Sequence, residues 1–387
     1  MEEPHDNERD NTNYIQELHS LIENILERKR STVQGRVDAF ADFCRITKFH
    51  YVEDQLRPRV KDLLAALLKS VKQESSQEET IAALQALELL AISAYDDTVY
   101  QHAEPQLSRT IRDSTSNNAK AAAIYCLGSC AVFGGAGADD VFGQMTLLLD
   151  IVASDGQSID AADDPESVTA AIRTWAFLAT EMEDLEAESE EAVQIFVDQL
   201  ASALVEVQIA AGENIALLYE KSYSEDDEEE EELVKRYDAY HNTHEITEQV
   251  ESLATIHSKR ISKKEKKSLH SSFLSVLTTV SDPRRGPMYN TAIDQDTGRS
   301  YGSRAVVRIG EDRAIDIDRW WKWIRLGWIR RILRGGFTVH FSQVNRAVLD
   351  LLPVRSSASG NNQNDRSRKA MKTRSEARRF AIHHDEE

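Results

Sequence analysis

Cysteine and proline are both scarce in this chain of 387 residues. The three cysteines, Cys44, Cys126 and Cys130, are too sparse for a disulfide scaffold, so a reducing compartment is expected. Only seven prolines occur, and none lies between Pro165 and Pro283. Because proline interrupts helices, a stretch of that length without it favours long helices over a loop-rich β fold.

Long apolar runs and catalytic motifs are also missing. No segment approaches the roughly 18–20 apolar residues that a bilayer span requires, and the polar, acidic N-terminus is unlike a secretory or mitochondrial signal. No phosphate-binding glycine loop, nucleophile elbow or zinc-protease motif is present. His241 and His244 lie three residues apart, but the sequence places no third metal ligand beside them. We therefore expect a soluble intracellular protein that is not an enzyme and needs no cofactor or metal.

Basic residues are scarce in the first part of the chain. Residues 1–232 hold 17 basic and 48 acidic side chains, a net charge of −31. Residues 233–387 hold 29 basic and 18 acidic side chains, a net charge of +11. This asymmetry indicates a charged partner for one end. The basic end suits nucleic acid, and the acidic part would keep the protein away from non-specific polyanions.

Apolar residues recur at three- and four-residue steps from about Tyr14 to Val280, the spacing typical of amphipathic helices. One stripe consists of Leu63, Leu64, Leu67, Leu68 and Val71. The next begins at Ile81, Leu84, Leu87, Glu88 and Ala91, with a second apolar side that predicts packing between two neighbours. Further helices are expected over residues 99–111, 119–133, 141–152, 167–181, 192–204 and 207–219.

Successive helix pairs start about 40 residues apart, as in HEAT and armadillo arrays. The small residues Ala210, Ala211 and Gly212 would let a neighbouring helix approach closely. The predicted fold is therefore mainly α: a HEAT/armadillo-like α-solenoid, whose extended concave surface is suited to binding other macromolecules.

The pattern changes beyond Pro283. Turn signals and β-favouring runs occupy residues 286–310, and residues 316–333 read as a helix that Gly335 and Gly336 terminate. Residues 337–341 look like a strand and residues 345–352 like a helix. The sequence therefore predicts a small α+β module.

The expected organisation has four parts. They are a disordered N-terminus (1–13), helical repeats (14–282) with an acidic insertion (224–232), the α+β module (283–353), and a flexible linker with a basic tail (354–387). The insertion, S-E-D-D-E-E-E-E-E, is interpreted as a solvated segment or as a docking site for a basic partner such as a histone or ribosomal protein.

Basic side chains gather in three segments that we predict to contact RNA, because lysine and arginine neutralise phosphates. The first segment comprises Lys259, Arg260, Lys263, Lys264, Lys266 and Lys267. The second, which we regard as weaker, comprises Arg319, Lys322, Arg325, Arg330 and Arg331. The third lies in the tail and comprises Arg366, Arg368, Lys369, Lys372, Arg374, Arg378 and Arg379. The first and third segments are alternatively nuclear-import signals.

The second basic segment also contains four of the five tryptophans: Trp320, Trp321, Trp323 and Trp328. Aromatic rings beside arginines can stack on bases. A helix with two apolar stripes is more often packed between layers, with its arginines reaching outward. We favour the second interpretation, in which the tryptophans belong to the core.

Three segments between residues 301 and 341, Y-G-S-R-A-V-V-R-I-G, D-I-D-R-W-W-K-W-I-R-L and L-R-G-G-F-T-V-H-F, carry a family resemblance. Together they resemble the C-terminal domain of the interferon-related developmental regulator family. Upstream, K-K-E-K-K at residues 263–267 with Phe273 resembles the family's basic lead-in. The armadillo-like N-terminal domain of that family fits the helical repeats, so the resemblance covers roughly residues 25–350.

This resemblance implies no enzymatic activity, cofactor or small-molecule substrate. It implies instead a factor that binds translationally inactive ribosomes and represses translation, with basic C-terminal elements in the mRNA and tRNA path. The partners would then be rRNA and proteins of the small subunit, in the cytoplasm. The family's second described role leaves an alternative open: a nuclear transcriptional co-regulator that recruits histone-deacetylase-containing complexes. Neither role involves a membrane.

Overall fold

The computed structural model describes residues 6–28, 31–223, 235–255, 262–293, 300–303, 305–309, 313–353 and 355–356. The chain forms two compact units. Unit 1 holds Met1–Val141 and Trp328–Leu351, and unit 2 holds Phe142–Gly327 and Leu352–Glu387. Residues 283–353, expected to form one module, are therefore divided between the two units.

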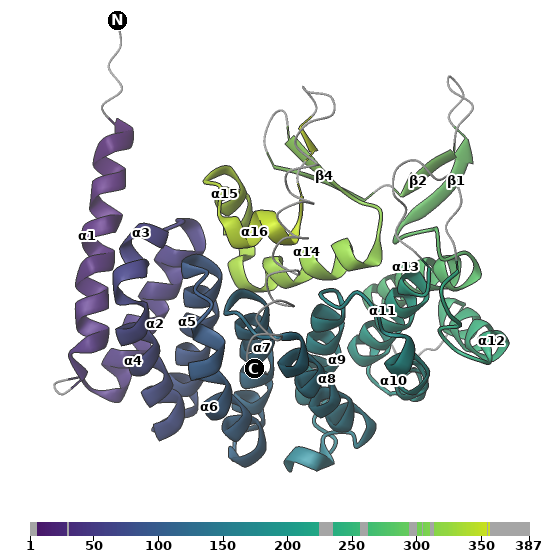
Figure 1. The fold of residues 1–387 in the computed structure, drawn as a ribbon, viewed down its shortest axis with the longest axis horizontal. Coiled ribbons are helices and arrows are strands. Elements are labelled where there is room, and N and C mark those ends of the chain that lie inside the picture. Colours follow the sequence, from purple (N-terminus) through teal and green to yellow (C-terminus); the bar gives the residue numbers. More distant parts are fainter. Residues whose placement is uncertain are drawn as a thin grey trace, which may run out of the picture. The chain divides into compact units, whose positions relative to one another are not determined.

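Unit 1 is built largely from a two-layer array of helices (Figure 1). One layer contains α2, α5 and α7, and the other contains α4 and α6, with α4 beside α5 and α6 beside α7. The bounds are α1 Asp6–Leu26, α2 Val33–Phe49, α3 Glu53–Leu56, η2 Arg57–Arg59, α4 Val60–Gln73, α5 Gln77–Ala94, α6 Val99–Asp113 and α7 Asn117–Phe133. The start of α8, Ala138–Ala153, also belongs here.

Unit 2 repeats the same arrangement. α11 packs between α9 and α13 in one layer, while α10 lies against α11 and α12 against α13. The bounds are η3 Gln157–Ile159, α9 Pro165–Ala179, α10 Glu186–Gln199, α11 Val205–Lys221, α12 Thr243–Ala254 and α13 Lys263–Ser281. The first helices of the successive pairs, α4, α6 and α8, start at residues 60, 99 and 138, which is two intervals of 39 residues. The predicted HEAT/armadillo-like fold is confirmed.

Local chemistry explains where many of these helices begin. The side chains of Ser76, Ser116 and Asp164 each accept a hydrogen bond from the backbone N–H three residues later. Such N-caps satisfy donors that the first helical turn leaves unpaired. Between the caps, α5 buries almost its whole circumference from Ala83 to Ala94, as expected for a helix with two apolar sides.

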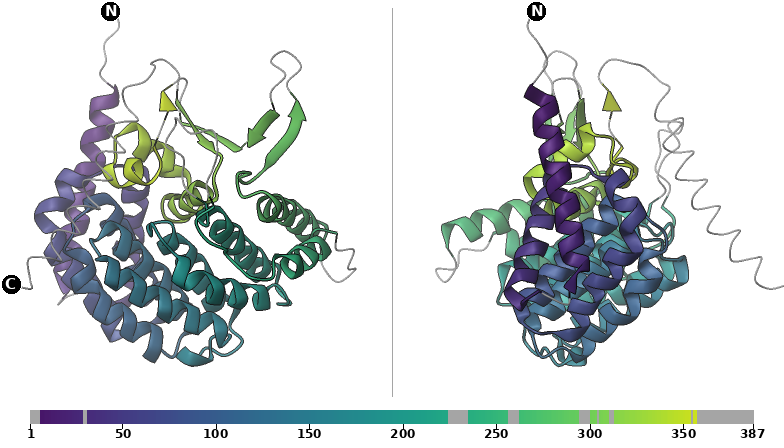
Figure 2. Two further views of the ribbon diagram at one scale, coloured as in Figure 1. Left: turned by 45° about the vertical axis from the view of Figure 1, so that its right-hand side comes forward. Right: turned by 90° about the vertical axis from the view of Figure 1, so that its left-hand side faces the viewer.

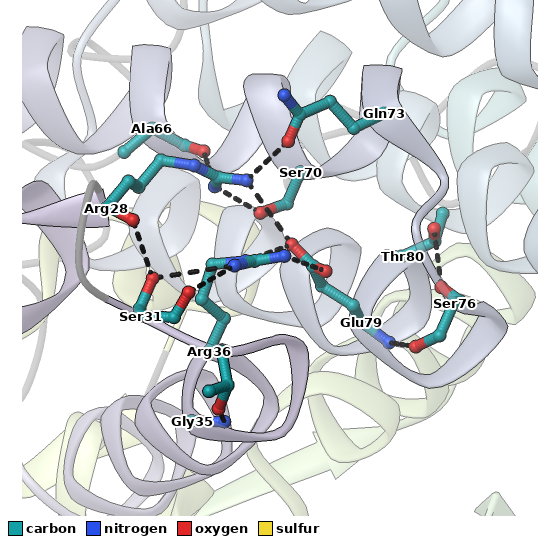
Figure 3. Close-up of polar contacts among 11 residues, drawn as sticks. Arg28, Ser31, Gly35, Arg36, Ala66, Ser70, Gln73, Ser76, Glu79 and Thr80 are labelled. Carbon is teal, nitrogen blue, oxygen red and sulfur yellow. Dashed lines mark hydrogen bonds and ion pairs between the residues drawn. The ribbon is translucent and has the colours of Figure 1, made fainter.

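A buried carboxylate ties the first helices of unit 1 together (Figure 3). Glu79 at the start of α5 forms a bidentate pair with Arg36 of α2, at 2.7 Å for both contacts, and also meets Arg28. Burial raises the pKa of the Glu79 carboxyl, but hydrogen bonds from Arg36 and Ser70 and the two arginine charges bring it below its usual value. Arg28 further donates to the Ala66 carbonyl at 3.0 Å, which anchors the end of α1 on α4.

The close approach predicted for the small residues of α11 is confirmed at Gly212. A Cβ atom on this residue would lie 2.9 Å from Cε1 of Phe273, which is fully buried on α13. Only a glycine allows the aromatic ring to lie this near the α11 backbone. Phe273, part of the predicted family lead-in, therefore joins α11 to α13.

Two small antiparallel sheets follow α13. β1 Tyr289–Ile293 pairs with β2 Ser300–Ser303, and the left view of Figure 2 shows these strands side by side. β3 Ala305–Arg308, β4 Arg313–Ile317 and β5 Arg355–Ser356 form the second sheet. β3 and β4 pair from Ala305↔Ile317 to Arg308↔Ala314. The expected β-favouring run is thus a strand.

The last helices are α14 Trp320–Leu333, η4 Arg334–Gly336, α15 Phe337–Ser342 and α16 Arg346–Leu351. The strand predicted over residues 337–341 is wrong, because these residues form α15. His340 donates from Nε2 to the Thr47 carbonyl at 3.0 Å, and its Nδ1 accepts from Asn345 at 2.9 Å. These buried contacts hold the helical turn against α2, so tertiary packing overrides the local β preference.

The bounds of two further predicted segments need correction. α1 begins at Asp6, so residues 6–13 are helical rather than disordered. No glycine or proline stands between residues 6 and 26 to interrupt that helix. The helix expected from residue 316 begins at Trp320, because Asp316 and Ile317 pair with β3.

Candidate nucleic-acid interface

Four of the predicted RNA-contacting residues lie together in the first turns of α13. Lys263, Lys264 and Lys267 are exposed and Lys266 is half-buried. Ser262 caps the helix in a capping box with Glu265, and these hydrogen bonds hold the pKa of the Glu265 carboxyl below its usual value. In the described part of the chain, no ion pair engages any of the four lysines.

The position of these lysines is unfavourable for the helix itself. A helix N-terminus carries a partial positive charge, so cations there are repelled. Lys263 also stands three and four residues from Lys266 and Lys267, the spacings at which like charges destabilise a helix. These positive charges therefore do not stabilise α13. They are available to bind a phosphate group, which the positive end of the helix also attracts.

Arg325, predicted to contact RNA, is only 2% exposed. Its Nε donates to Oγ1 of Thr180 at 2.9 Å, and Nη2 reaches the Thr180 carbonyl and Oε1 of Glu181, each at 2.7 Å. The guanidinium also lies 4.9 Å from the centre of the Trp321 ring. Because its charged group is in the core of unit 2, the surface contact expected from the sequence does not fit this residue.

Two more basic residues of α14 are engaged within the fold. Lys322 pairs with Asp318 one turn earlier, and its side chain is 15% exposed. Arg331 pairs with the buried Glu88 of α5 and lies over the rings of Tyr125 and Trp328. The Lys322 pair is local to the start of α14, whereas the Arg331 pair joins the end of α14 to α5.

The remaining two residues of this segment are more open. Arg319 is half-buried and donates to the Arg284 carbonyl at 3.4 Å. Arg330 is exposed, and its guanidinium lies 5.2 Å from the centre of the Phe337 ring. Both side chains can reach a phosphate at the surface, and their RNA contacts remain predictions from the sequence.

The other candidates lie outside the described residues. This applies to the acidic run 224–232 and to Lys259, Arg260, Arg366, Arg368, Lys369, Lys372, Arg374, Arg378 and Arg379. Their RNA contacts remain predictions from the sequence.

The core interpretation of the tryptophan-rich helix is confirmed for Trp320 and Trp328, whereas Trp321 and Trp323 are half-buried. Trp320 and Trp328 are 1% and 4% exposed. Their indole N–H groups donate to Thr279 at 2.7 Å and to Ser129 at 3.1 Å, and that of Trp323 donates to Glu213 at 3.0 Å. A buried indole needs such a partner, so these rings are fixed in the protein rather than offered to bases.

The sequence did not reveal the acidic partners of α14. Glu220 receives the first backbone N–H groups of the helix, and Glu88 receives Arg331 near its end. A usable signal existed at Glu88, which interrupts an otherwise apolar stripe of α5. A buried carboxylate requires a charged or hydrogen-bonding partner, although the pattern does not say which one.

The described residues show neither a metal centre nor a membrane span. No group of three or more histidine, cysteine or acidic side chains in this part of the chain is arranged to hold a metal ion. Likewise, none of the helices described here is long and apolar enough to cross a bilayer. Burial raises the pKa of the Cys44 thiol to about 12, and the thiol pKa of Cys126 is raised for the same reason. These cysteines are core residues rather than nucleophiles.

Comparison with known proteins adds the decisive observation. The model of the interferon-related developmental regulator family matches residues 1–281, from α1 to the end of α13. The chain belongs to this family. A relative in Schizosaccharomyces pombe, the uncharacterized protein C20F10.03, is 25% identical over 344 residues, covering 85% of this chain and 72% of its own length. The family is in general regulatory and non-enzymatic, and the matched region is the helical array rather than the motif at residues 301–341.

Proposed function

We propose that this family member is a non-enzymatic ribosome-binding factor that associates with translationally inactive ribosomes and represses translation. Basic C-terminal elements would occupy the path of mRNA and tRNA on the small subunit, in contact with rRNA and ribosomal proteins. The site of action would be the cytoplasm. Family membership and the helical-repeat fold support this proposal, because both suit a scaffold that binds a large partner.

The observation that carries the proposal is the lysine group at the start of α13. Lys263, Lys264 and Lys267 are exposed and unpaired within the described structure, although their charges work against the helix. They lie in the part of the chain with a net charge of +11. Phosphate contacts of this kind bind RNA through its shape and backbone, and they weaken as salt displaces them.

A charge-reversal experiment tests this assignment. Lys263, Lys264 and Lys267 are changed together to glutamate, a change that also suits the positive end of the helix and so preserves α13. The control reverses three exposed lysines of α4, Lys61, Lys69 and Lys72, with the same change in net charge. Binding to vacant ribosomes is then measured by sedimentation.

We expect the α13 variant to lose about tenfold or more in affinity, since each phosphate contact supports binding, while the control stays near the wild type. Equal binding by both variants would remove α13 from the interface. If neither the wild type nor the variants bind ribosomes, the alternative of a nuclear co-regulator scaffold becomes the leading account. Exclusion of the protein from the nucleus would in turn argue against that alternative.

A further inference from the structure

A small polar cavity of about 60 Å³ lies in unit 1, near the ends of α2 and α14. Lys48 lines it from α2, Gln85 and Glu88 from α5, and Arg331 and Arg334 from the end of α14 and from η4. Leu89 and Ile332 complete the lining, and of the five polar side chains three are cationic and one is a carboxylate. The lining is therefore suited to an anion.

The single carboxylate of the lining, that of Glu88, already accepts hydrogen bonds from within the protein. Glu88 receives both terminal nitrogens of Arg331, one at 3.1 Å, and also the hydroxyl of Ser129 at 2.8 Å. Within the described residues, no ion pair engages Lys48 or Arg334, and the buried Nε of Arg331 has no hydrogen-bond partner. Two positive charges, those of Lys48 and Arg334, thus remain at the cavity.

The fold brings the two unpaired cations together through a glycine contact. A Cβ atom on Gly336 would lie only 1.7 Å from the carbonyl oxygen of Lys48, so only glycine lets η4 rest on the end of α2. Arg334 stands two residues earlier with a φ of 51°, in the left-handed region where glycine is usual after a helix. The chain therefore keeps an arginine beside Lys48 at a conformational cost.

An exposed aromatic ring adjoins the same place. Phe49 follows Lys48 directly and is 47% exposed. Its Cε1 atom lies 3.7 Å from where a Cβ atom on Gly335, the neighbour of Arg334, would be. A cationic cavity beside an open ring is the combination by which proteins hold single-stranded nucleic acid, with the backbone in the charged groove and a base stacked on the ring.

We propose that this cavity binds one backbone phosphate of a single-stranded RNA, with the adjacent base stacked on Phe49. The phosphate oxygens accept hydrogen bonds from Lys48 Nζ and from the Arg334 guanidinium. This inference rests on the proposed function and adds to it an RNA contact in unit 1, independent of the lysines of α13.

The test uses the full-length protein and a labelled single-stranded RNA of about eight nucleotides, a length within the range that such sites bind. Affinity is measured by fluorescence anisotropy at several salt concentrations. The main variant combines Lys48→Ala with Arg334→Gly, which removes both charges and relieves the left-handed arginine, so its folding is not impaired. The control combines Lys61→Ala with Lys69→Ala, two exposed lysines of α4.

We expect the main variant to lose about tenfold or more in affinity, and its salt dependence, log K against log salt, to flatten by about 0.7, since one neutralised single-strand phosphate contributes about that much. The control keeps the affinity of the wild type to within about twofold. Phe49→Leu, which removes the ring but no charge, weakens binding by about fivefold or more while leaving the salt slope unchanged.

Equal affinity of the main variant and the control would overturn the proposal, and so would a wild type that binds no RNA. A wild type that binds a phosphoserine peptide or inorganic phosphate but not RNA would assign the cavity to another ligand and would equally overturn it. The lysines of α13 are unchanged in all of these variants. Ribosome sedimentation of their charge-reversal variant tests the proposed function separately.

Discussion

Glu220 accepts hydrogen bonds from the backbone N–H groups of both Trp320 and Trp321, at 2.7 and 3.2 Å. A carboxylate from the end of α11 thus caps the N-terminus of α14, a hundred residues further along the chain. An anion at this position satisfies two unpaired donors and complements the helix dipole. The tryptophan-rich helix is therefore anchored at its first turn by a residue that is itself only 8% exposed.

Removal of this cap should destabilise the protein. We predict that Glu220→Ala lowers the free energy of unfolding by about 1–3 kcal/mol, because the N–H groups of Trp320 and Trp321 lose their acceptor. Chemical denaturation followed by tryptophan fluorescence measures the effect. Glu206→Ala, an exposed acidic residue on the same helix, is the control. Similar unfolding midpoints for the two variants would contradict the capping role.

Arg325 should matter for stability rather than for RNA. Arg325→Met retains much of the side-chain length but leaves the Thr180 carbonyl and Glu181 without their partner. We predict a loss of about 2–4 kcal/mol in the free energy of unfolding. The half-buried Arg319 serves as the control, and Arg319→Met should cost much less.

Ribosome sedimentation of the Arg325→Met variant, at a temperature where it is folded, should match the wild type. Loss of ribosome binding by a fully folded Arg325→Met variant would contradict a purely structural role for Arg325.

His340 should make stability depend on pH. Burial lowers the pKa of this imidazole to about 4, although hydrogen bonds to the Thr47 and Lys48 carbonyls act in the opposite direction. The unfolded chain, with a histidine pKa near 6.5, then binds the proton first as pH falls. Stability from this residue is thus fully present above about pH 6.5 and is lost between there and about pH 4.

The difference amounts to about 2 kcal/mol between pH 7 and pH 5, since one pKa unit corresponds to about 1.4 kcal/mol. Denaturation at both pH values should show this loss in the wild type and in His19→Gln, an exposed control. His340→Gln keeps a donor for the Thr47 carbonyl but has no titrating imidazole. Its loss of stability between pH 7 and pH 5 should therefore be smaller by about 2 kcal/mol. An unchanged pH dependence in His340→Gln would count against a buried neutral imidazole.

The contact of Gly212 with Phe273 supports a prediction by double mutation. Gly212→Ala should destabilise the protein by about 1–3 kcal/mol, because the new methyl group overlaps the buried ring. Phe273→Leu alone leaves a cavity and is also destabilising. In the double variant the two effects should partly cancel, and thermal unfolding of the four proteins measures the coupling. Simple additivity would mean that the ring does not press against α11.

Much of the fold could be predicted because it depends on local periodicity. Leu63, Leu64, Leu67 and Val71 of the predicted stripe are buried in α4, and Leu68 is half-buried. The interval of about 40 residues between helix pairs is also present. These signals repeat along the chain and depend only on which face of a helix is apolar. The alternating residues 337–341 misled the prediction, because their helix depends on Thr47, almost 300 residues earlier.

The candidate site was less predictable because it depends on contacts between residues that are distant in the sequence. Basic residues can be counted in a sequence, but their burial depends on partners elsewhere in the chain. Arg325 finds Thr180 and Arg331 finds Glu88, so neither is a free surface charge. Lys263, Lys264 and Lys267 are exposed, whereas nothing local in the sequence connects Lys48 with Arg334.

The most direct test of the central claim is sedimentation of the full-length protein with vacant ribosomes at a low and a high salt concentration. The account predicts co-sedimentation at low salt that falls steeply as salt rises, because the lysines of α13 displace counterions from RNA. It also predicts that reversal of Lys263, Lys264 and Lys267 flattens this dependence, whereas reversal of the α4 lysines does not. Absence of co-sedimentation at low salt would contradict the account.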